Sequence, residues 1–535
     1  MLERSTWLIW IAILALYAAV RVPLLPVPLE RDEGAFGLVG QAILRGAVPY
    51  RDILDHKPPA VYYAYAGALL VVPPTAAGVH GFLMVWNLAT LLCLASLAGE
   101  LAGPLAARWT AVLFAVVSAA PSIQGFSTTT EMLLLLPLVA SWRTAAAATR
   151  AAASRRVLLF ALSGALGAAA CWLKQPAILP LAIVPLFVLG ENGGARAARS
   201  GADLAAWAGG AALLSLAIVA CFWSAGALRE LWYWTVEHNR LYAEQPVTDW
   251  ALRLRVRATN VLWDGGVPLA VGLCAAAAAL AQRRRRAWIA PVFVALSAAA
   301  VAHSGYFYTH YFALLAPALA LIGGLGLAWG QELVTRGWGR RAAAPFAVVA
   351  LAAVAAPPLL ARPWYWLGPQ PADVALRTFG PQGFESAERL ADYLRAQTKP
   401  DDTIFIYGSE PQIAFEAERR LATAFATVYP LTRPWPRHRE FQERAWAELE
   451  RAQPAYLVLA RVPASLDRSP TSDPFFEQHL TELLRRAYRG DVVLVADPAG
   501  GAQLSRTLPA AGSGAVVQFE LWRRSDLFDS KEGAG

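Results

Sequence analysis

The sequence is dominated by apolar runs of roughly 15 to 22 residues, separated by polar connections. A run of that length is long enough for an α-helix to cross the hydrocarbon core of a bilayer. The pattern therefore predicts a polytopic α-helical membrane protein with about eleven transmembrane helices. Their expected limits are 7–25, 80–100, 105–121, 131–148, 157–173, 176–190, 203–225, 260–281, 287–303, 311–330 and 343–361.

Basic residues between the apolar runs predict the orientation, because cytoplasmic connections carry an excess of Lys and Arg. The basic connections are 143–156, 196–199, 283–286 and 336–341, and all fall on one side if the eleven runs cross. The amino terminus then lies in the cytoplasm and the carboxy-terminal region outside it. The apolar stretch 58–74 is short and bracketed by prolines, so we expect a juxtamembrane or re-entrant helix there.

Beyond residue 380 the pattern changes to short β-rich runs that alternate with amphipathic stretches. We expect strands at 402–407, 455–460, 491–496 and 516–522, and helices at 384–398 and 438–452. The chain should therefore consist of a transmembrane domain over 1–365 and an extracytoplasmic α/β domain over 380–525.

The most polar connection follows the first apolar run, at residues 30–63. It begins with Asp32 and Glu33, and its middle has the apolar spacing of a short amphipathic helix that Gly46 and Pro49 end. Such a helix would lie along the bilayer surface. An ordinary solvated loop remains the alternative.

Composition supports a membrane protein, because 56% of the 535 residues are hydrophobic. The net charge of +8 comes from clusters in the connections, so it indicates topology rather than nucleic-acid binding. All four cysteines lie in apolar runs, and we expect neither disulfides nor a thiolate metal site.

Several connections predicted to be outside carry ionisable groups, which an inert membrane anchor would not need. Asp32 or Glu33 could remove a proton from a hydroxyl group. Lys57, Arg51 and Lys174 could neutralise a phosphate. The remaining candidates for substrate contact are Asp55, His56, Tyr62, Glu131, His310 and Tyr311.

Each candidate also has a structural interpretation. Glu131 could cap a helix that follows three threonines, Lys174 could extend from a span end toward water, and His310 could be a satisfied structural histidine. An outer tyrosine such as Tyr62 often belongs to the aromatic belt of a membrane protein. No fixed ligand spacing predicts a metal site, and the need for a divalent cation is left open.

One combination of motifs is more specific. The Asp32-Glu33 pair is followed by Tyr50-Arg51-Asp52 and by His56-Lys57-Pro58-Pro59. This combination resembles the first outer loop of GT-C membrane glycosyltransferases, in particular the family that includes protein O-mannosyltransferases and the lipid A aminoarabinose transferase. Thr130-Glu131 and His310-Tyr311 are similar to later elements of that family.

The resemblance implies a GT-C-like fold in the bacterial cytoplasmic membrane and transfer of a sugar from a polyprenyl-phosphate donor to a hydroxyl acceptor, with inversion. It implies Asp32 as the base with Glu33 in support, and Lys57 as the phosphate contact. The acceptor could be a lipid, a glycan or a protein. A transporter or flippase of a lipid-linked glycan is the alternative, and a non-catalytic anchoring protein is a third hypothesis.

Overall fold

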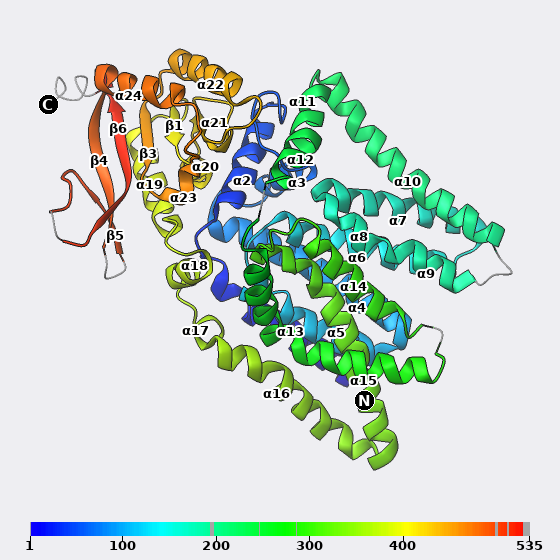
Figure 1. The fold of residues 1–535 in the computed structure, drawn as a ribbon. Coiled ribbons are helices and arrows are strands. Elements are labelled where there is room, and N and C mark those ends of the chain that lie inside the picture. The colour runs from blue at the N-terminus through cyan, green and yellow to red at the C-terminus, as the bar shows by residue number, and fades with distance from the viewer. Residues whose placement is uncertain are drawn as a thin grey trace. The chain divides into compact units, whose positions relative to one another are not determined.

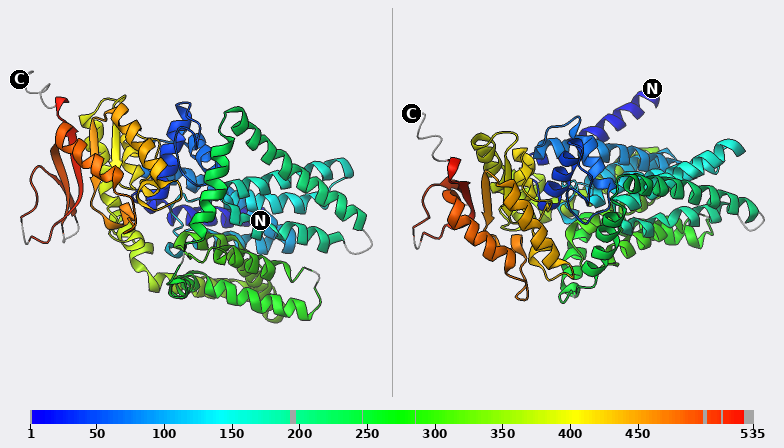
Figure 2. Two further views of the ribbon diagram at one scale, coloured as in Figure 1. Left: turned by 45° about the horizontal axis from the view of Figure 1, so that its top comes forward. Right: turned by 90° about the horizontal axis from the view of Figure 1, so that it is seen from above.

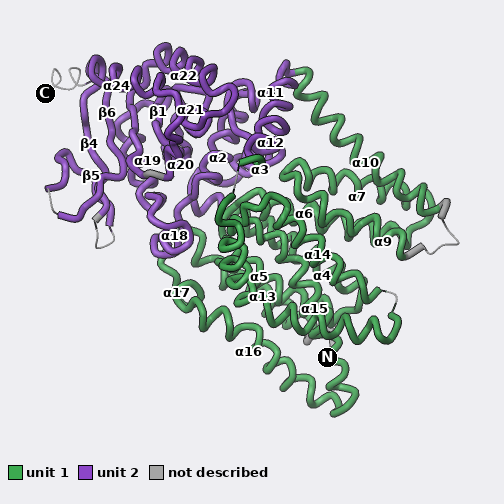
Figure 3. The backbone as a smooth tube through the Cα atoms, in the orientation of Figure 1, with its two compact units in different colours: residues 1–26, 80–224, 243–370 green, residues 27–79, 225–242, 371–535 purple. Residues whose placement is uncertain are grey.

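The structure is a computed structural model that describes residues 2–192, 197–245, 247–284, 286–497, 501–510 and 513–527. Parts of the predicted basic connections 196–199 and 283–286 therefore lie outside the described residues. The chain forms two compact units (Figure 3). The helical unit comprises residues 1–26, 80–224 and 243–370, and the α/β unit comprises 27–79, 225–242 and 371–535.

The helical unit consists of apolar helices, most of them long (Figure 1). They are α1 (Leu2–Ala19), α4 (Ala76–Ala102), α5 (Pro104–Val117), α6 (Thr130–Ala148), α7 (Ala153–Leu173), α8 (Ile178–Leu181), α9 (Ile183–Asn192), α10 (Ala197–Ser224), α13 (Trp250–Ala281), α14 (Ile289–Ala302), α15 (Ala316–Trp338), α16 (Ala343–Ala361) and α17 (Pro363–Trp366). Glycines allow some of them to approach closely. A Cβ on Gly164 of α7 would lie 1.7 Å from the carbonyl oxygen of Trp207 on α10.

Within the described residues, eight helices are long and apolar enough to cross a membrane. Three shorter apolar helices, Pro104–Val117, Gln175–Gly190 and Ile289–Ala302, coincide with the three remaining predicted runs. The positions of the predicted helices are confirmed, whereas the number that cross stays a prediction. The predicted start of one helix at residue 260 is wrong, because α13 begins at Trp250. Its first turns carry Arg253, Arg255 and Arg257, which interrupt the apolar pattern.

The α/β unit combines the first polar connection with the carboxy-terminal region. Its helices are α2 (Arg31–Leu44), α3 (Ala60–Leu69), α11 (Leu228–Trp232), the π-helix η5 (Tyr233–Glu237), α12 (His238–Ala243), α18 (Pro371–Phe379), α19 (Phe384–Gln397), α20 (Pro411–Ala417), α21 (Tyr429–Thr432), α22 (His438–Ala452), α23 (Pro463–Leu466) and α24 (Phe475–Ala487). Its strands are β1 (Thr403–Tyr407), β2 (Arg420–Leu421), β3 (Tyr456–Ala460), β4 (Tyr488–Asp497), β5 (Gly501–Ser505) and β6 (Val516–Arg524).

The six strands form one mixed sheet in the order β2-β1-β3-β6-β4-β5. β1 pairs in parallel with β2 and β3, whereas the β4–β5 hairpin and its partner β6 pair antiparallel (Figures 1 and 2). The four predicted strands and two predicted helices are confirmed. The sequence did not predict β2, which has two residues, or β5 at the sheet edge. The division into domains at 1–365 and 380–525 stays a prediction.

α2 packs directly on α20, which places the first polar connection against the carboxy-terminal region inside the α/β unit. Two glycines on one face of α2 make this contact. A Cβ on Gly34 would lie 2.3 Å from the backbone nitrogen of Gln412, and one on Gly37 would lie 2.7 Å from the ring of Phe415. Arg31 adds a 3.0 Å ion pair with the buried Glu410. The position of α2 therefore depends on residues almost 400 positions later in the chain.

We predict that Gly34→Ala destabilises the α/β unit, because the new methyl group meets backbone that a side-chain rotation cannot move. Overpacking of this kind costs roughly 1–3 kcal/mol, more than the roughly 1 kcal/mol that alanine gains over glycine in a helix. Thermal unfolding in detergent measures the effect. Gly67→Ala on α3 is the matched control, since a Cβ there has no neighbour within 4 Å. Equal unfolding temperatures for the two variants would contradict the prediction.

Candidate functional site

The first turn of α2 separates two adjacent carboxylates. Glu30, just before the helix, accepts hydrogen bonds from the backbone nitrogens of Asp32 (2.9 Å) and Glu33 (3.1 Å). The Glu33 carboxylate accepts in return from the backbone nitrogen of Glu30, at 3.3 Å. This reciprocal arrangement is a capping box, and it satisfies amides that the helix leaves without internal partners. Glu33 is therefore committed to the start of the helix, where it is fully buried.

Asp32 remains accessible. Its side chain is 33% exposed, and one of its oxygens lies 3.4 Å from the Nζ atom of Lys57, which is 17% exposed. The structure thus brings together the two residues that the sequence assigns to proton removal and to phosphate binding. A carboxylate and an ammonium at this separation, both reachable from solvent, provide a base and a cation side by side.

Tyrosines hold the segment that carries Lys57. The Tyr50 hydroxyl donates to the carbonyl oxygen of Lys57 at 2.6 Å. The Tyr62 hydroxyl accepts from the backbone nitrogen of Lys57 at 3.0 Å and donates to Asp55 at 2.9 Å. Both rings are fully buried. Burial and the Asp55 charge raise the pKa of Tyr62 well above its usual value, so the hydroxyl keeps its proton. This burial disfavours the predicted contact of Tyr62 with substrate and points to a positioning role.

Asp55 and His56 form a second pair beside Lys57. The Asp55 carboxylate lies 3.1 Å from Nδ1 of His56 and accepts from the His56 backbone nitrogen at 2.7 Å. Burial alone would raise the pKa of Asp55, but the hydrogen bonds from His56 and the nearby charge of Lys57 outweigh it and lower the pKa. Asp55 is therefore a charged anchor for the segment, and His56 remains partly exposed next to it.

Two residues that support this segment were missed by sequence reasoning. Asn239 donates to the carbonyl oxygen of His56 at 2.9 Å, and the ring of His238 lies 5.7 Å from the ring of His56. Burial and the neighbouring His56 lower the pKa of His238 to about 3, so its ring is neutral near pH 7. The only signal in the sequence is the polar run Glu237-His238-Asn239 within an aromatic stretch. Arg51, in contrast, is exposed and pairs with Asp52 at 2.8 Å rather than with the Asp32–Lys57 pair.

The helical unit contains a separate polar cluster of three residues from distant parts of the sequence. Glu131, in the first turn of α6, forms an ion pair with Lys174, which follows α7. His310 lies in the 3-10 helix η6 (Thr309–Leu315), with its Nε2 atom 3.8 Å from the same Glu131 oxygen. Thr129 rather than Glu131 accepts the capping hydrogen bond at the start of α6. The alternative that Glu131 only caps its helix is therefore not supported.

Aromatic rings surround this cluster. The Nζ atom of Lys174 lies 4.0 Å from the centre of the Tyr311 ring, a cation–π distance. Tyr308 stacks on His310 at 5.8 Å and on Tyr306 at 5.4 Å. Gln124 contacts the other nitrogen of His310, with 3.2 Å between Oε1 and Nδ1. The rings and the ion pair together form one polar aromatic cluster within the helical unit.

The predicted residues thus form two groups. Asp32, Asp55, His56 and Lys57 lie together in the α/β unit, and Glu131, Lys174, His310 and Tyr311 lie together in the helical unit. That both groups lie on the outer side of the membrane stays a prediction. Among the described residues, no group of three His, Cys, Asp or Glu side chains could hold a metal ion.

No family model matches the sequence, and no curated protein sequence matches it. Solved structures do match the fold. ArnT from Cupriavidus metallidurans, bound to undecaprenyl phosphate, superposes with a TM-score of 0.59 at 15% identity and covers 94% of this chain and 98% of its own. The oligosaccharyltransferase AglB from Archaeoglobus fulgidus, in complex with an inhibitory peptide and a dolichol-phosphate, superposes with a TM-score of 0.52 at 12% identity. The match covers 99% of this chain and 77% of AglB.

This chain has the GT-C fold. ArnT and AglB are both members of the GT-C superfamily, so the fold that the sequence motifs implied is confirmed. The structure of ArnT in the apo state also superposes on this chain, with a TM-score of 0.57 over 97% of this chain. The chain is accordingly of the multi-pass membrane type.

We predict that Lys174→Met destabilises the helical unit, because it leaves the buried Glu131 carboxylate without its main cation. Breaking a buried pair in this way costs about 3–5 kcal/mol. Thermal unfolding in detergent should show the loss, and combining the change with Glu131→Gln should restore much of it. Lys399→Met, at an exposed position of the α/β unit, is the control. If Lys174→Met unfolds like wild type, the ion pair does not matter for stability.

The end of α20 that lies near α19 also carries a titrating group. Glu416 on α20 is 6% exposed. Burial, followed by the charges of Glu388 and Asp392, raises its pKa to about 8. The folded chain therefore keeps this proton up to about pH 8, whereas the unfolded chain, with the ordinary value of 4.5, releases it much earlier. Stability must fall as the pH rises between these two values.

We predict that Glu416→Gln removes this pH dependence. The variant should differ little from wild type below pH 4.5 and be more stable above pH 8, with the gap growing by about 1.4 kcal/mol per pH unit between them. Thermal unfolding at pH 5.5 and 8.5 tests this. The exposed Glu482→Gln should not change the slope. If Glu416→Gln changed the unfolding temperature by the same amount at both pH values, its effect would not be electrostatic.

Proposed function

We propose that this chain is a glycosyltransferase that moves a sugar from a polyprenyl-phosphate donor to a hydroxyl acceptor, with inversion at the anomeric carbon. The observation that carries the proposal is the Asp32–Lys57 pair, with 3.4 Å between Oδ2 and Nζ. The fold supports it, because ArnT and AglB have been seen with undecaprenyl phosphate and dolichol-phosphate.

Asp32 acts as the general base in this proposal. It takes the proton of the acceptor hydroxyl as the hydroxyl oxygen attacks the anomeric carbon from the face opposite the phosphate. Glu33 does not contact the acceptor, because the capping box holds its carboxylate at the start of α2. Its supporting role is to fix the first turn of the helix and thereby the position of Asp32.

Lys57 acts on the leaving group. The bond between the anomeric carbon and the phosphate oxygen breaks, and the electron pair leaves with the phosphate. This anion is stable, so no strong acid is required, and a cation close to it lowers the barrier further. Asp55, Tyr50 and Tyr62 hold the backbone on both sides of Lys57 and so place its ammonium group.

We assign the Glu131–Lys174–His310 cluster to substrate binding, with Tyr311 and its neighbouring rings as a platform for the sugar. Ionisable side chains are costly to bury within the helical unit of a membrane protein, and such groups mark sites of substrate contact. We further propose that the reaction takes place at the outer face of the bacterial cytoplasmic membrane.

We predict that Asp32→Asn reduces transfer by at least about 100-fold while the protein still folds, because general base catalysis typically contributes 10²–10⁴-fold. Mass spectrometry of envelope lipids, glycans and proteins identifies the product by comparing cells with and without the wild-type chain. The same product is then quantified in cells that make the variant. Asp52→Asn is the matched control, since Asp52 is an exposed carboxylate of the same loop that pairs with Arg51.

Two outcomes would contradict the proposal. Normal product from Asp32→Asn would remove Asp32 from the role of base. Sugar movement into vesicles without a covalent product would instead favour a transporter or flippase.

A further inference from the structure

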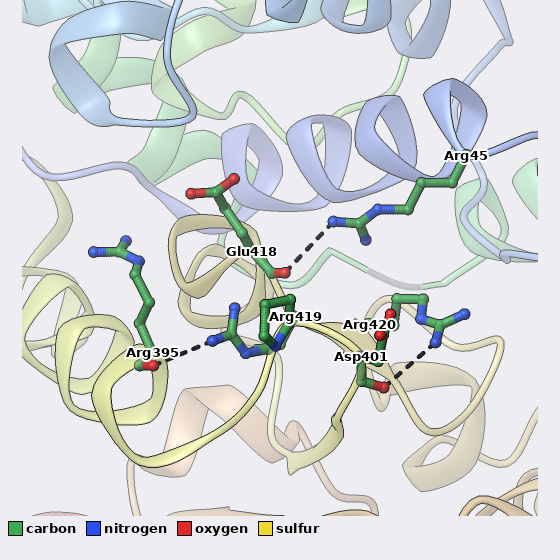
Figure 4. A pocket seen from close by; sticks show the side chains of 7 residues that line it. Arg45, Arg395, Asp401, Glu418, Arg419 and Arg420 are labelled. Carbon is green, nitrogen blue, oxygen red and sulfur yellow. Dashed lines mark hydrogen bonds between the residues drawn. The ribbon is translucent and has the colours of Figure 1, made fainter.

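The α/β unit contains a cavity of about 640 Å³ that the proposed reaction does not use. It lies where the end of α2 meets the end of α19 and the segment between α20 and β2 (Figure 4). Its lining residues are Arg45, Arg395, Pro400, Asp401, Glu418, Arg419 and Arg420. The formal charges of the lining residues sum to +2, and one of the arginines, Arg395, also forms an ion pair with Asp392 outside the lining at 2.8 Å.

Arg419 forms the buried floor of the cavity. Its guanidinium group donates to the Thr398 hydroxyl at 2.8 Å and to the carbonyl oxygens of Ala417, Arg395 and Thr398 at 3.0 to 3.1 Å. These bonds tie the end of α19 to the start of β2. The cavity therefore has a built base rather than a floor of mobile surface side chains.

The walls carry arginines that are held only weakly. Arg45 donates to the carbonyl oxygen of Glu418 and Arg420 to that of Asp401, both at 3.4 Å, and both side chains are exposed (Figure 4). In the described part of the chain, neither forms an ion pair with a carboxylate. Other arginines of this unit do, such as Arg439 with Glu443 and Arg461 with Glu520. The two wall arginines can therefore form ion pairs with a bound anion.

The arginines also repel one another. Burial and the neighbouring charges of Arg395 and Arg45 lower the pKa of Arg419, although Asp402 and Glu418 act in the opposite direction. An anion between them would relieve this repulsion. Arginine favours phosphate in particular, because its planar fork of N–H groups matches two phosphate oxygens.

We propose that this arginine pocket binds a phosphate-bearing group with two or more negative charges, of the diphosphate class. The volume admits more than one phosphate, and the wall arginines approach from two segments, Arg45 after α2 and Arg420 in β2. The site is distinct from Lys57. Arg45 follows the last residue of α2 and Asp32 lies in its first turn, so the helix separates the pocket from Asp32 by about 20 Å.

Isothermal titration calorimetry with inorganic pyrophosphate tests the proposal on the full chain in a neutral detergent. We expect wild type to bind and the double variant Arg45→Gln/Arg420→Gln to bind at least about tenfold more weakly, since both substitutions remove a charge and the hydrogen bonds that it donates. Added salt should weaken the binding. Thermal unfolding checks that the double variant is folded, which its exposed positions favour.

Two control variants make the result specific. Arg451→Gln removes an exposed arginine of α22 outside the pocket and should bind like wild type. Lys57→Gln should keep the pyrophosphate binding that Arg45→Gln/Arg420→Gln loses, because Lys57 belongs to the other site. No binding by wild type, or equal binding by the double variant, overturns the proposal. Binding lost with Lys57→Gln alone overturns it as well and leaves the proposed transfer reaction intact.

The source of the phosphate is identified in lipid nanodiscs. Phosphatidic acid added to phosphatidylcholine discs displaces pyrophosphate if the pocket takes a lipid headgroup, and it leaves binding unchanged if the pocket takes a phosphate group from solution. In either case the proposal requires that Arg45→Gln/Arg420→Gln lose the pyrophosphate signal in the phosphatidylcholine discs.

Discussion

The reciprocal hydrogen bonding at the start of α2 is the interaction on which the candidate site depends. The Glu33 carboxylate accepts a hydrogen bond in the capping box at the start of the helix. The side chain of the adjacent Asp32 remains accessible. A simple loop would let both side chains turn in many directions, at a cost in entropy whenever a substrate bound. Here the first turn of the helix is ordered before any substrate arrives, and in the proposed function this order places the Asp32 backbone relative to Lys57.

The second constraint is the packing of α2 on α20. Glycines at positions 34 and 37 let the two helices approach until backbone and ring atoms touch, and Arg31 pairs with Glu410 beside them. The carboxy-terminal region is therefore part of the support of Asp32, at least within the α/β unit. Deleting residues 380–535 would remove α20 together with the sheet, so loss of activity in such a truncation would not distinguish a direct role in the reaction from a structural one.

The sequence predicted what depends on local pattern. Apolar runs located the helices, and the motif around Lys57 located its neighbours Asp55 and His56. The resemblance implied different roles for Asp32 and Glu33, but the pattern did not predict the capping box that holds Glu33, because a capping box depends on side-chain directions rather than on spacing alone. Asn239 and His238 were missed because they reach His56 from a distant segment. The start of α13 was placed too late because three arginines interrupt its apolar pattern.

The ion pair of the helical unit is explained better by a function than by a gain in stability. Burying a carboxylate and an ammonium costs several kcal/mol per ion, and their attraction in a dry interior often does no more than offset that cost. Apolar side chains of similar size would stabilise a helical bundle at least as well. The chain nevertheless places Glu131, Lys174 and His310 together, with stacked rings beside them. This placement supports the proposed substrate-binding role, in which a polar ligand would exchange its own hydrogen bonds for those of the protein.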